Sequence, residues 1–61
     1  MGYGYTVTNS IDMIDTYCSN PSKYKMWQIR EAIHDAKTHY ENGNVSKAWY
    51  DYVVSILTPY A

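Results

Sequence analysis

The feature that most constrains the fold of this chain is the position of its helix-breaking residues. Pro21 and Gly43 stand between stretches in which apolar residues recur at helical spacing, and Pro59 follows the last of these stretches. Proline suits the first position of a helix and stops a preceding one, while glycine adopts the left-handed conformation that ends a helix. Asn20 and Asn44 precede the second and third stretches, where a side-chain oxygen can cap free backbone amides. We therefore expect an all-α fold with helices at residues 10–18, 21–42 and 45–57.

Residues 1–8 precede the first expected helix. Large side chains alternate with small or polar ones over residues 3–7, which is typical of a strand, but the two early glycines weaken that pattern. We expect a flexible or strand-like arm that carries Tyr3 and Tyr5. No repeat, linker or low-complexity stretch is present in the 61 residues, so we expect one small domain, residues 1–61.

The glycine turn lies within a wider pattern of small and aromatic residues. Their spacing resembles the tetratricopeptide helix-turn-helix unit: Ala36, Tyr40, Gly43, Val45, Ala48, Tyr52 and Ile56. The resemblance covers residues 32–60, and the sequence departs from that pattern at Ala32, Asp35 and Ser55. Arrays of such units contain about three or more repeats, whereas this chain has one. The resemblance implies an antiparallel helical hairpin with a tight turn, and neither family membership nor a chaperone-adaptor role.

The second expected helix is divided lengthwise into three faces. One is an apolar seam with steps of three and four residues, formed by Met26, Ile29, Ile33, Ala36 and Tyr40. A basic flank beside Trp27 carries three residues that are seven apart, Lys23, Arg30 and Lys37. The opposite flank carries Glu31 and Asp35. We expect the seam to form the core and both flanks to face solvent.

The third expected helix is apolar around most of its circumference, and only Lys47, Asp51 and Ser55 define a polar edge. Such a helix is buried on more than one side, which one long and one short neighbour would not achieve. One cysteine allows no internal disulfide, and ordering each residue costs about 1.5 kcal/mol, so a core this small is marginal. We therefore expect a homodimer that completes a helical bundle. Its interface is expected at Trp49, Tyr50, Val53, Val54 and Leu57.

The sequence offers few residues for catalysis or metal binding. Glu31 and His34 have the Glu-x-x-His spacing of di-iron bundles, but they point away from the apolar seam. Asp35 and His39 are expected to form a surface pair, since they are four residues apart. Cys18 lies on the apolar face of the first helix, where a free cysteine is usually buried and inert. We expect no enzyme activity, no cofactor and no metal.

The aromatic composition indicates a binding function. The chain has eight tyrosines and two tryptophans but one leucine and no phenylalanine. Tyrosine and tryptophan are enriched at hot spots of protein interfaces, because they bury a large area and keep a polar tip. The residues expected to bind a partner are Tyr24, Trp27, Arg30, His34, Lys37, Tyr3 and Tyr5. We expect a small protein-binding protein of inhibitor or adaptor type, in the size class of those that phages and other mobile elements encode.

The alternative is a small nucleic-acid-binding regulator that uses Lys23, Arg30 and Lys37, because basic side chains among aromatic ones hold phosphates and stack on bases. A formal net charge of −1 and a pI of about 6.0 favour protein over nucleic acid as the partner. No apolar run approaches the ~18 residues of a membrane span, and no signal peptide is recognisable. The expected location is the cytoplasm, without membrane contact.

Overall fold

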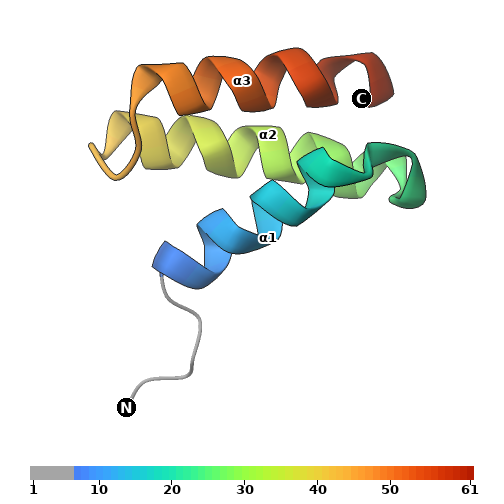
Figure 1. Ribbon diagram of the computed structural model, residues 1–61, viewed down its shortest axis with the longest axis horizontal. Coiled ribbons are helices and arrows are strands. Elements are labelled where there is room, and N and C mark those ends of the chain that lie inside the picture. Colours follow the sequence, from blue (N-terminus) through green and yellow to red (C-terminus); the bar gives the residue numbers. More distant parts are fainter. Residues whose placement is uncertain (1–6) are drawn as a thin grey trace.

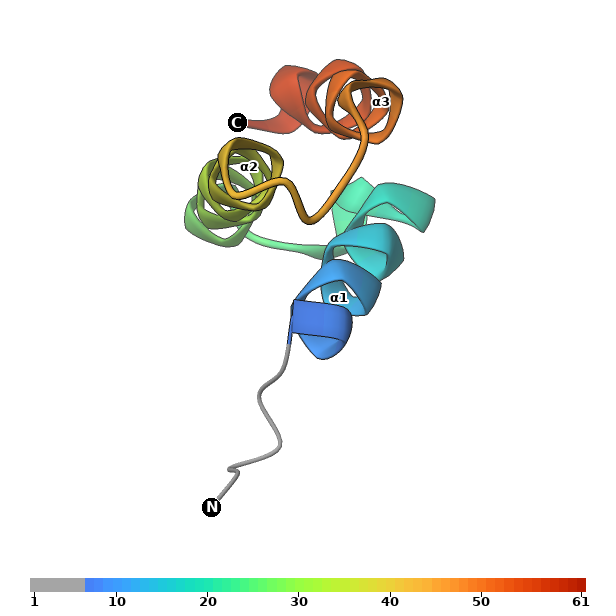
Figure 2. The same cartoon turned by 90° about the vertical axis from the view of Figure 1, so that its left-hand side faces the viewer.

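The computed structural model describes residues 7–61, and its regular elements are all helical. They are α1 (Val7–Ser19), the 3-10 helix η1 (Pro21–Lys23), α2 (Met26–Glu41), α3 (Lys47–Leu57) and the 3-10 helix η2 (Thr58–Tyr60). In Figure 1, α2 and α3 lie side by side and run in opposite directions, and α1 crosses beside them. Figure 2, seen along α2 and α3, shows the three helices at the corners of a triangle, and each contacts the other two. The all-α fold class is confirmed for the described residues.

The first helix begins earlier than expected. Val7 and Thr8, which the sequence assigned to the arm, form the first turn of α1. The strand-like alternation expected over residues 3–7 therefore does not hold at Val7, which is helical. The rest of the expected arm, with Tyr3 and Tyr5, lies outside the described residues.

The expected helix over residues 21–42 is interrupted near its start. Asn20 and Pro21 open only the short helix η1, and the backbone is extended again at Lys25, with φ −77° and ψ 157°. The Gln28 side-chain Oε1 then accepts a hydrogen bond from the Lys25 N–H at 2.9 Å. This bond satisfies one of the free amides at a helix start, so α2 begins at the following residue.

The turn between α2 and α3 is set by Gly43, as the sequence indicates. Its φ is 78°, and its N–H donates to the Tyr40 carbonyl at 3.0 Å, while Asn44 N–H donates to the His39 carbonyl at 2.9 Å. These two bonds satisfy the last carbonyls of α2. The expected cap of the third helix is wrong, because the Ser46 hydroxyl, and not Asn44, accepts a backbone N–H of its first turn at 3.1 Å.

The core lies between the three helices. It consists of Ile14 and Cys18 from α1, Ile29, Ala32 and Ala36 from α2, and Val53 and Leu57 from α3. The seam expected on α2 is wrong at its two ends, because Met26 is 54% exposed and Tyr40 37%. Ala32 is buried although the seam did not include it. Because α2 packs against α1 as well as α3, its buried stripe widens toward α1, where a small side chain allows a close approach.

Part of the apolar surface of the third helix is covered within one chain. Both α1 and α2 pack against α3, and Val53 and Leu57 are 0% exposed. The expectation that these two residues face a second copy is therefore wrong. Its physical basis fails because α1 is a 13-residue helix, longer than the sequence indicated, and it covers the side of α3 that α2 leaves open.

Candidate functional site

A groove lies between α1 and α2, and residues of both helices line it. Its floor is formed by Ile14 and Ala32, which also belong to the core. Its walls carry two large apolar side chains, Trp27 from α2, which is 61% exposed, and Met13 from α1, which is 41% exposed. A tryptophan that exposed adds nothing to the core, so its apolar surface is available to another molecule.

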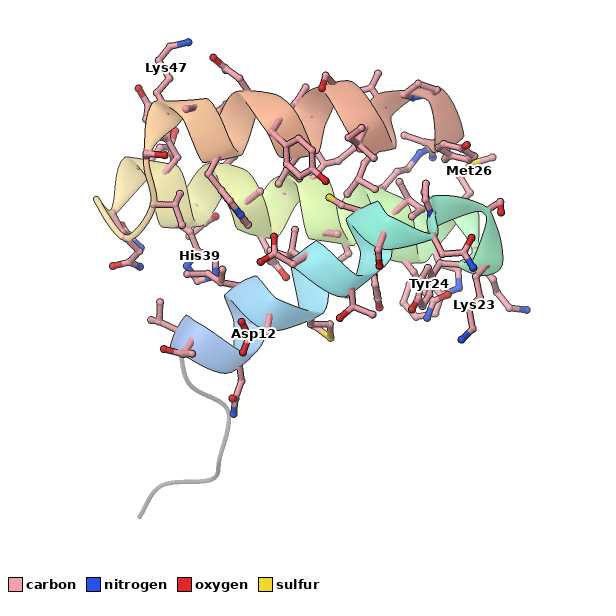
Figure 3. The ribbon with its side chains drawn as sticks, in the orientation of Figure 1. Asp12, Lys23, Tyr24, Met26, His39 and Lys47 are labelled. Atoms are coloured by element: carbon pink, nitrogen blue, oxygen red, sulfur yellow. The ribbon has the colours of Figure 1, made fainter. Side chains whose placement is uncertain are left out.

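The wall of the groove on α1 is extended by an aromatic stack. Tyr17, which lines the groove, stacks on Tyr24 with ring centroids 4.1 Å apart and planes at 26°. Tyr24 lies between η1 and α2 (Figure 3), so this stack ties that connection to α1. Both rings are half-buried. Tyr24 was expected to bind a partner directly, and the structure uses one face of its ring inside the chain.

The polar side of the groove is acidic. Gln28, Glu31 and Asp35 line it from α2, and none of the described residues that line it is a lysine, an arginine or a histidine. Glu31 is exposed and Asp35 half-buried. Within residues 7–61 the structure contains one salt bridge, between Lys47 and Asp51 on α3, so both groove carboxylates lack a cation. The side chains of Glu31 and Asp35 therefore give the groove a negative potential.

The expected pair of Asp35 and His39 does not form. His39 points from α2 toward the first turns of α1 (Figure 3), and its Nε2 lies 2.9 Å from the Ser10 hydroxyl. Its Nδ1 lies 3.3 Å from the Asn44 side-chain nitrogen. This chain of hydrogen bonds joins α1, α2 and the α2–α3 connection. Because Ser10 is only 2% exposed, its hydroxyl is not an accessible nucleophile.

The basic residues expected near Trp27 are only partly brought together. Arg30, His34 and Lys37 are exposed on α2, and none of the three lines the groove. Lys23 belongs to η1, at one end of the molecule (Figure 3), so it does not share the seven-residue helical register of the other two. The register was wrong because it assumed one continuous helix. The groove beside Trp27 is therefore lined by acidic residues, while Arg30 and His34 lie on α2 outside it, three and seven residues after Trp27.

The aromatic residues expected at a dimer interface have partners inside the chain. Trp49 is half-buried, and its indole N–H donates to Asp15 Oδ1 on α1 at 2.9 Å. Tyr50 is half-buried and stacks on Tyr40 of α2, with ring centroids 5.1 Å apart and planes at 5°. Val54, the remaining expected contact, is half-buried as well. These contacts use surface that the sequence assigned to a second copy.

The described residues offer little for redox or metal chemistry. Cys18 is buried, as the sequence indicated, and burial together with the nearby Asp15 carboxylate raises the pKa of its thiol. A raised pKa leaves less of the reactive thiolate at neutral pH. Among residues 7–61, no three potential metal ligands gather in one place, and Glu31 and His34 are both exposed.

The groove was not predicted from the sequence, because its lining residues come from two different helices. Met13 lies off the apolar stripe of α1, and Glu31 and Asp35 were placed on a solvated flank of α2. Only the crossing of α1 over that flank brings them together. One signal was present: Ala32, a small residue beside the acidic flank, marks where another helix can approach.

Of the features that the tetratricopeptide resemblance implies, the described residues show the antiparallel pair of α2 and α3 (Figure 1) and the turn at Gly43. In the described part of the chain, no helix is both long enough and apolar enough to cross a membrane. No protein-family model matches this sequence, and the searches of curated proteins and of solved structures gave no match either.

Proposed function

We propose that this chain is a small protein-binding protein without enzymatic activity, whose partner docks on the groove between α1 and α2. The observation that carries this proposal is the exposure of Trp27, 61%, opposite Met13 across a groove whose floor belongs to the core. Exposed tryptophans beside methionines are typical of binding hot spots, where a large rigid ring and an adaptable side chain share one pocket. A chain of this size acts through such contacts as an inhibitor or an adaptor.

Affinity purification of the tagged chain from its native host tests this proposal. The Trp27→Ala variant removes the groove wall, and Tyr52→Ala is the matched control, since Tyr52 is an aromatic residue on α3 that is 49% exposed and does not line the groove. We expect a protein that the parent chain and Tyr52→Ala retain and that Trp27→Ala loses. Equal retention by all three chains, or retention of nothing beyond an untagged control, would contradict the proposal.

The expected homodimer stays a proposal, with a different contact surface. Met26, Ile33 and Tyr40 are seven residues apart on α2 and share one face of it; the first and last are exposed and Ile33 is half-buried. A second copy that packs along this row would bury it. Light scattering at tens of micromolar is expected to give about 14 kDa, twice the 7.1 kDa chain, and Met26→Asp is expected to lower that mass. A folded 7.1 kDa particle would contradict the dimer.

Nucleic acid binding through Lys23, Arg30 and Lys37 is the second candidate. It is favoured by the absence of any salt bridge to these three cations within residues 7–61. The test is retention on heparin and a steep loss of binding to nucleic acid with added salt, both reduced in an Arg30→Gln/Lys37→Gln variant. Elution from heparin below physiological salt would exclude this function.

A further inference from the structure

The geometry points to a partner segment that is positively charged and carries one large apolar side chain, which seats between Met13 and Trp27. This inference rests on the proposed function and names the chemistry of its partner. It follows from three properties of the groove: the charge of its rim, the apolar character of its walls, and the spacing of both along α2.

The charge of the rim disfavours an acidic or phosphate-bearing occupant. Glu31 and Asp35 line the groove without a cation from any described residue that lines it. A docked segment would take water away from the half-buried Asp35, and removing water from a carboxylate is costly unless an opposite charge replaces it. A lysine or arginine side chain supplies that charge, whereas an anion would add repulsion.

The apolar walls require a side chain of matching character. Trp27 and Met13 stand on opposite sides of the groove, and Ile14 and Ala32 close its floor. An aliphatic or aromatic side chain placed between the walls would bury apolar surface on both. The face of an exposed indole also attracts an arginine or lysine within about 6 Å of its ring. The groove can therefore bind both the apolar side chain and the cationic side chains of such a segment.

The spacing of the groove residues sets the arrangement of the partner. Trp27, Glu31 and Asp35 follow one another at four-residue intervals on α2, so they share one edge of the helix. At a rise of 1.5 Å per residue, successive side chains lie about 6 Å apart along the axis. The partner segment should therefore present cations about 6 and 12 Å from its apolar anchor, which is the distance covered by one or two turns of a helix.

Selection from a random peptide library displayed on phage, with the full-length chain as bait, tests this inference. Enriched peptides are expected to carry a net positive charge and at least one large apolar residue. Their affinity is then measured by fluorescence anisotropy against three variants. Trp27→Ala removes the wall, and Glu31→Gln/Asp35→Asn neutralises the rim. The matched control, Asp12→Asn/Glu41→Gln, makes the same change in net charge at two exposed residues outside the groove.

We expect at least a tenfold loss of affinity for Trp27→Ala and for Glu31→Gln/Asp35→Asn, and a change of less than twofold for the control pair. Circular dichroism of all variants verifies that they remain helical. Equal losses for the two charge variants would overturn the inference, since net charge alone would then explain binding. Failure to enrich any peptide that depends on Trp27 would also overturn it.

The two proposals can fail separately. Peptides that depend on Trp27 but carry no net positive charge would overturn the assigned partner chemistry and leave the proposed function standing. If affinity purification retains no Trp27-dependent protein while basic peptides still bind, the groove has the inferred preference and the proposed cellular function fails.

Discussion

The contact between α2 and α3 differs in kind from the contacts that hold α1. Ile29 of α2 and Val53 and Leu57 of α3 are 0% exposed, and the Tyr40–Tyr50 stack closes the other end of this apolar contact. α1 also buries apolar residues, but two long-range hydrogen bonds accompany them. One joins His39 and Ser10, and the other runs from the Trp49 indole N–H to Asp15.

The two kinds of contact have different roles, because one contributes mainly to stability and the other to position. Apolar packing stabilises roughly in proportion to buried area and tolerates small shifts between helices. A hydrogen bond between two side chains is satisfied in one arrangement only, and an unpaired buried hydroxyl is costly. We infer that the apolar core, to which all three helices contribute, supplies most of the stability, while the two polar pairs fix where α1 crosses and thereby shape the groove.

Leu57→Ala is expected to have the largest effect, because it removes a fully buried side chain of the core. Truncation of a core leucine costs about 2–5 kcal/mol, a large share of the stability of a chain this small. Thermal unfolding followed by circular dichroism is expected to show a partly or fully unfolded variant. Val54→Ala, at a half-buried neighbour, is the control and should cost less than half as much. Equal losses would contradict the assignment of the core.

The next effect concerns the position of α1. His39→Ala leaves the buried Ser10 hydroxyl without its 2.9 Å partner, which is expected to cost about 1–3 kcal/mol in urea unfolding. Ser10→Ala in the His39→Ala background should recover part of that loss, because the unpaired group is then gone. Hydrogen exchange should accelerate in α1 more than in α2 and α3. An additive double variant, or uniform acceleration, would show that the pair does not position α1.

The sequence predicted those parts of the fold that depend on local chemistry. Gly43 ends α2 through the left-handed conformation that glycine adopts without strain, and Pro59 follows the end of α3. The start of α2 was not predictable in the same way. Asn20-Pro21 was a sound opening signal, but it opens only η1, and the Gln28 side chain competes with it for the helix start.

The site was less predictable than the fold, because it depends on where α1 crosses. Trp27 was correctly placed off the core seam, yet its neighbours were expected to be basic. Helical periodicity fixes which residues share a face but not which face a third helix covers. The pairing of His39 with Ser10, 29 residues earlier, has no local signature and displaced the expected contact with Asp35. The same limit produced the dimer interface at Val53 and Leu57, since the coverage by α1 was underestimated.

A smaller effect is expected from the second polar contact of α1. Trp49→Phe removes the indole N–H that donates to Asp15 Oδ1 at 2.9 Å and keeps most of the ring's packing. Because Asp15 is exposed and can bind water instead, the expected loss is about 0.5–1 kcal/mol in urea unfolding. Asp15→Asn retains an acceptor oxygen and should cost less than Asp15→Ala. The reverse order would indicate that the charge, and not the hydrogen bond, matters.

The pH dependence of stability provides a further comparison, at a residue where α1 meets the core. Burial, with a contribution from Asp15, raises the pKa of the Cys18 thiol above the ordinary value of 9.0. The folded state therefore holds the thiol proton more tightly than the unfolded state. This contribution is complete below pH 9 and is lost as the pH rises through the folded-state pKa. Relative to the parent, Cys18→Ala should show a shallower decline in unfolding free energy above pH 9; identical declines would contradict the shift.

The smallest effect on stability is expected from Trp27→Ala, although it removes the largest side chain of the groove. Its ring is 61% exposed and outside the core, so its loss should change the free energy of unfolding by no more than about 0.5 kcal/mol. Urea unfolding measures this against Trp49→Ala, which also removes one tryptophan but from a half-buried position. A large loss for Trp27→Ala would mean that the indole supports the crossing of α1. A negligible one leaves no structural reason for a tryptophan at the groove, and binding is then the remaining explanation for its exposure.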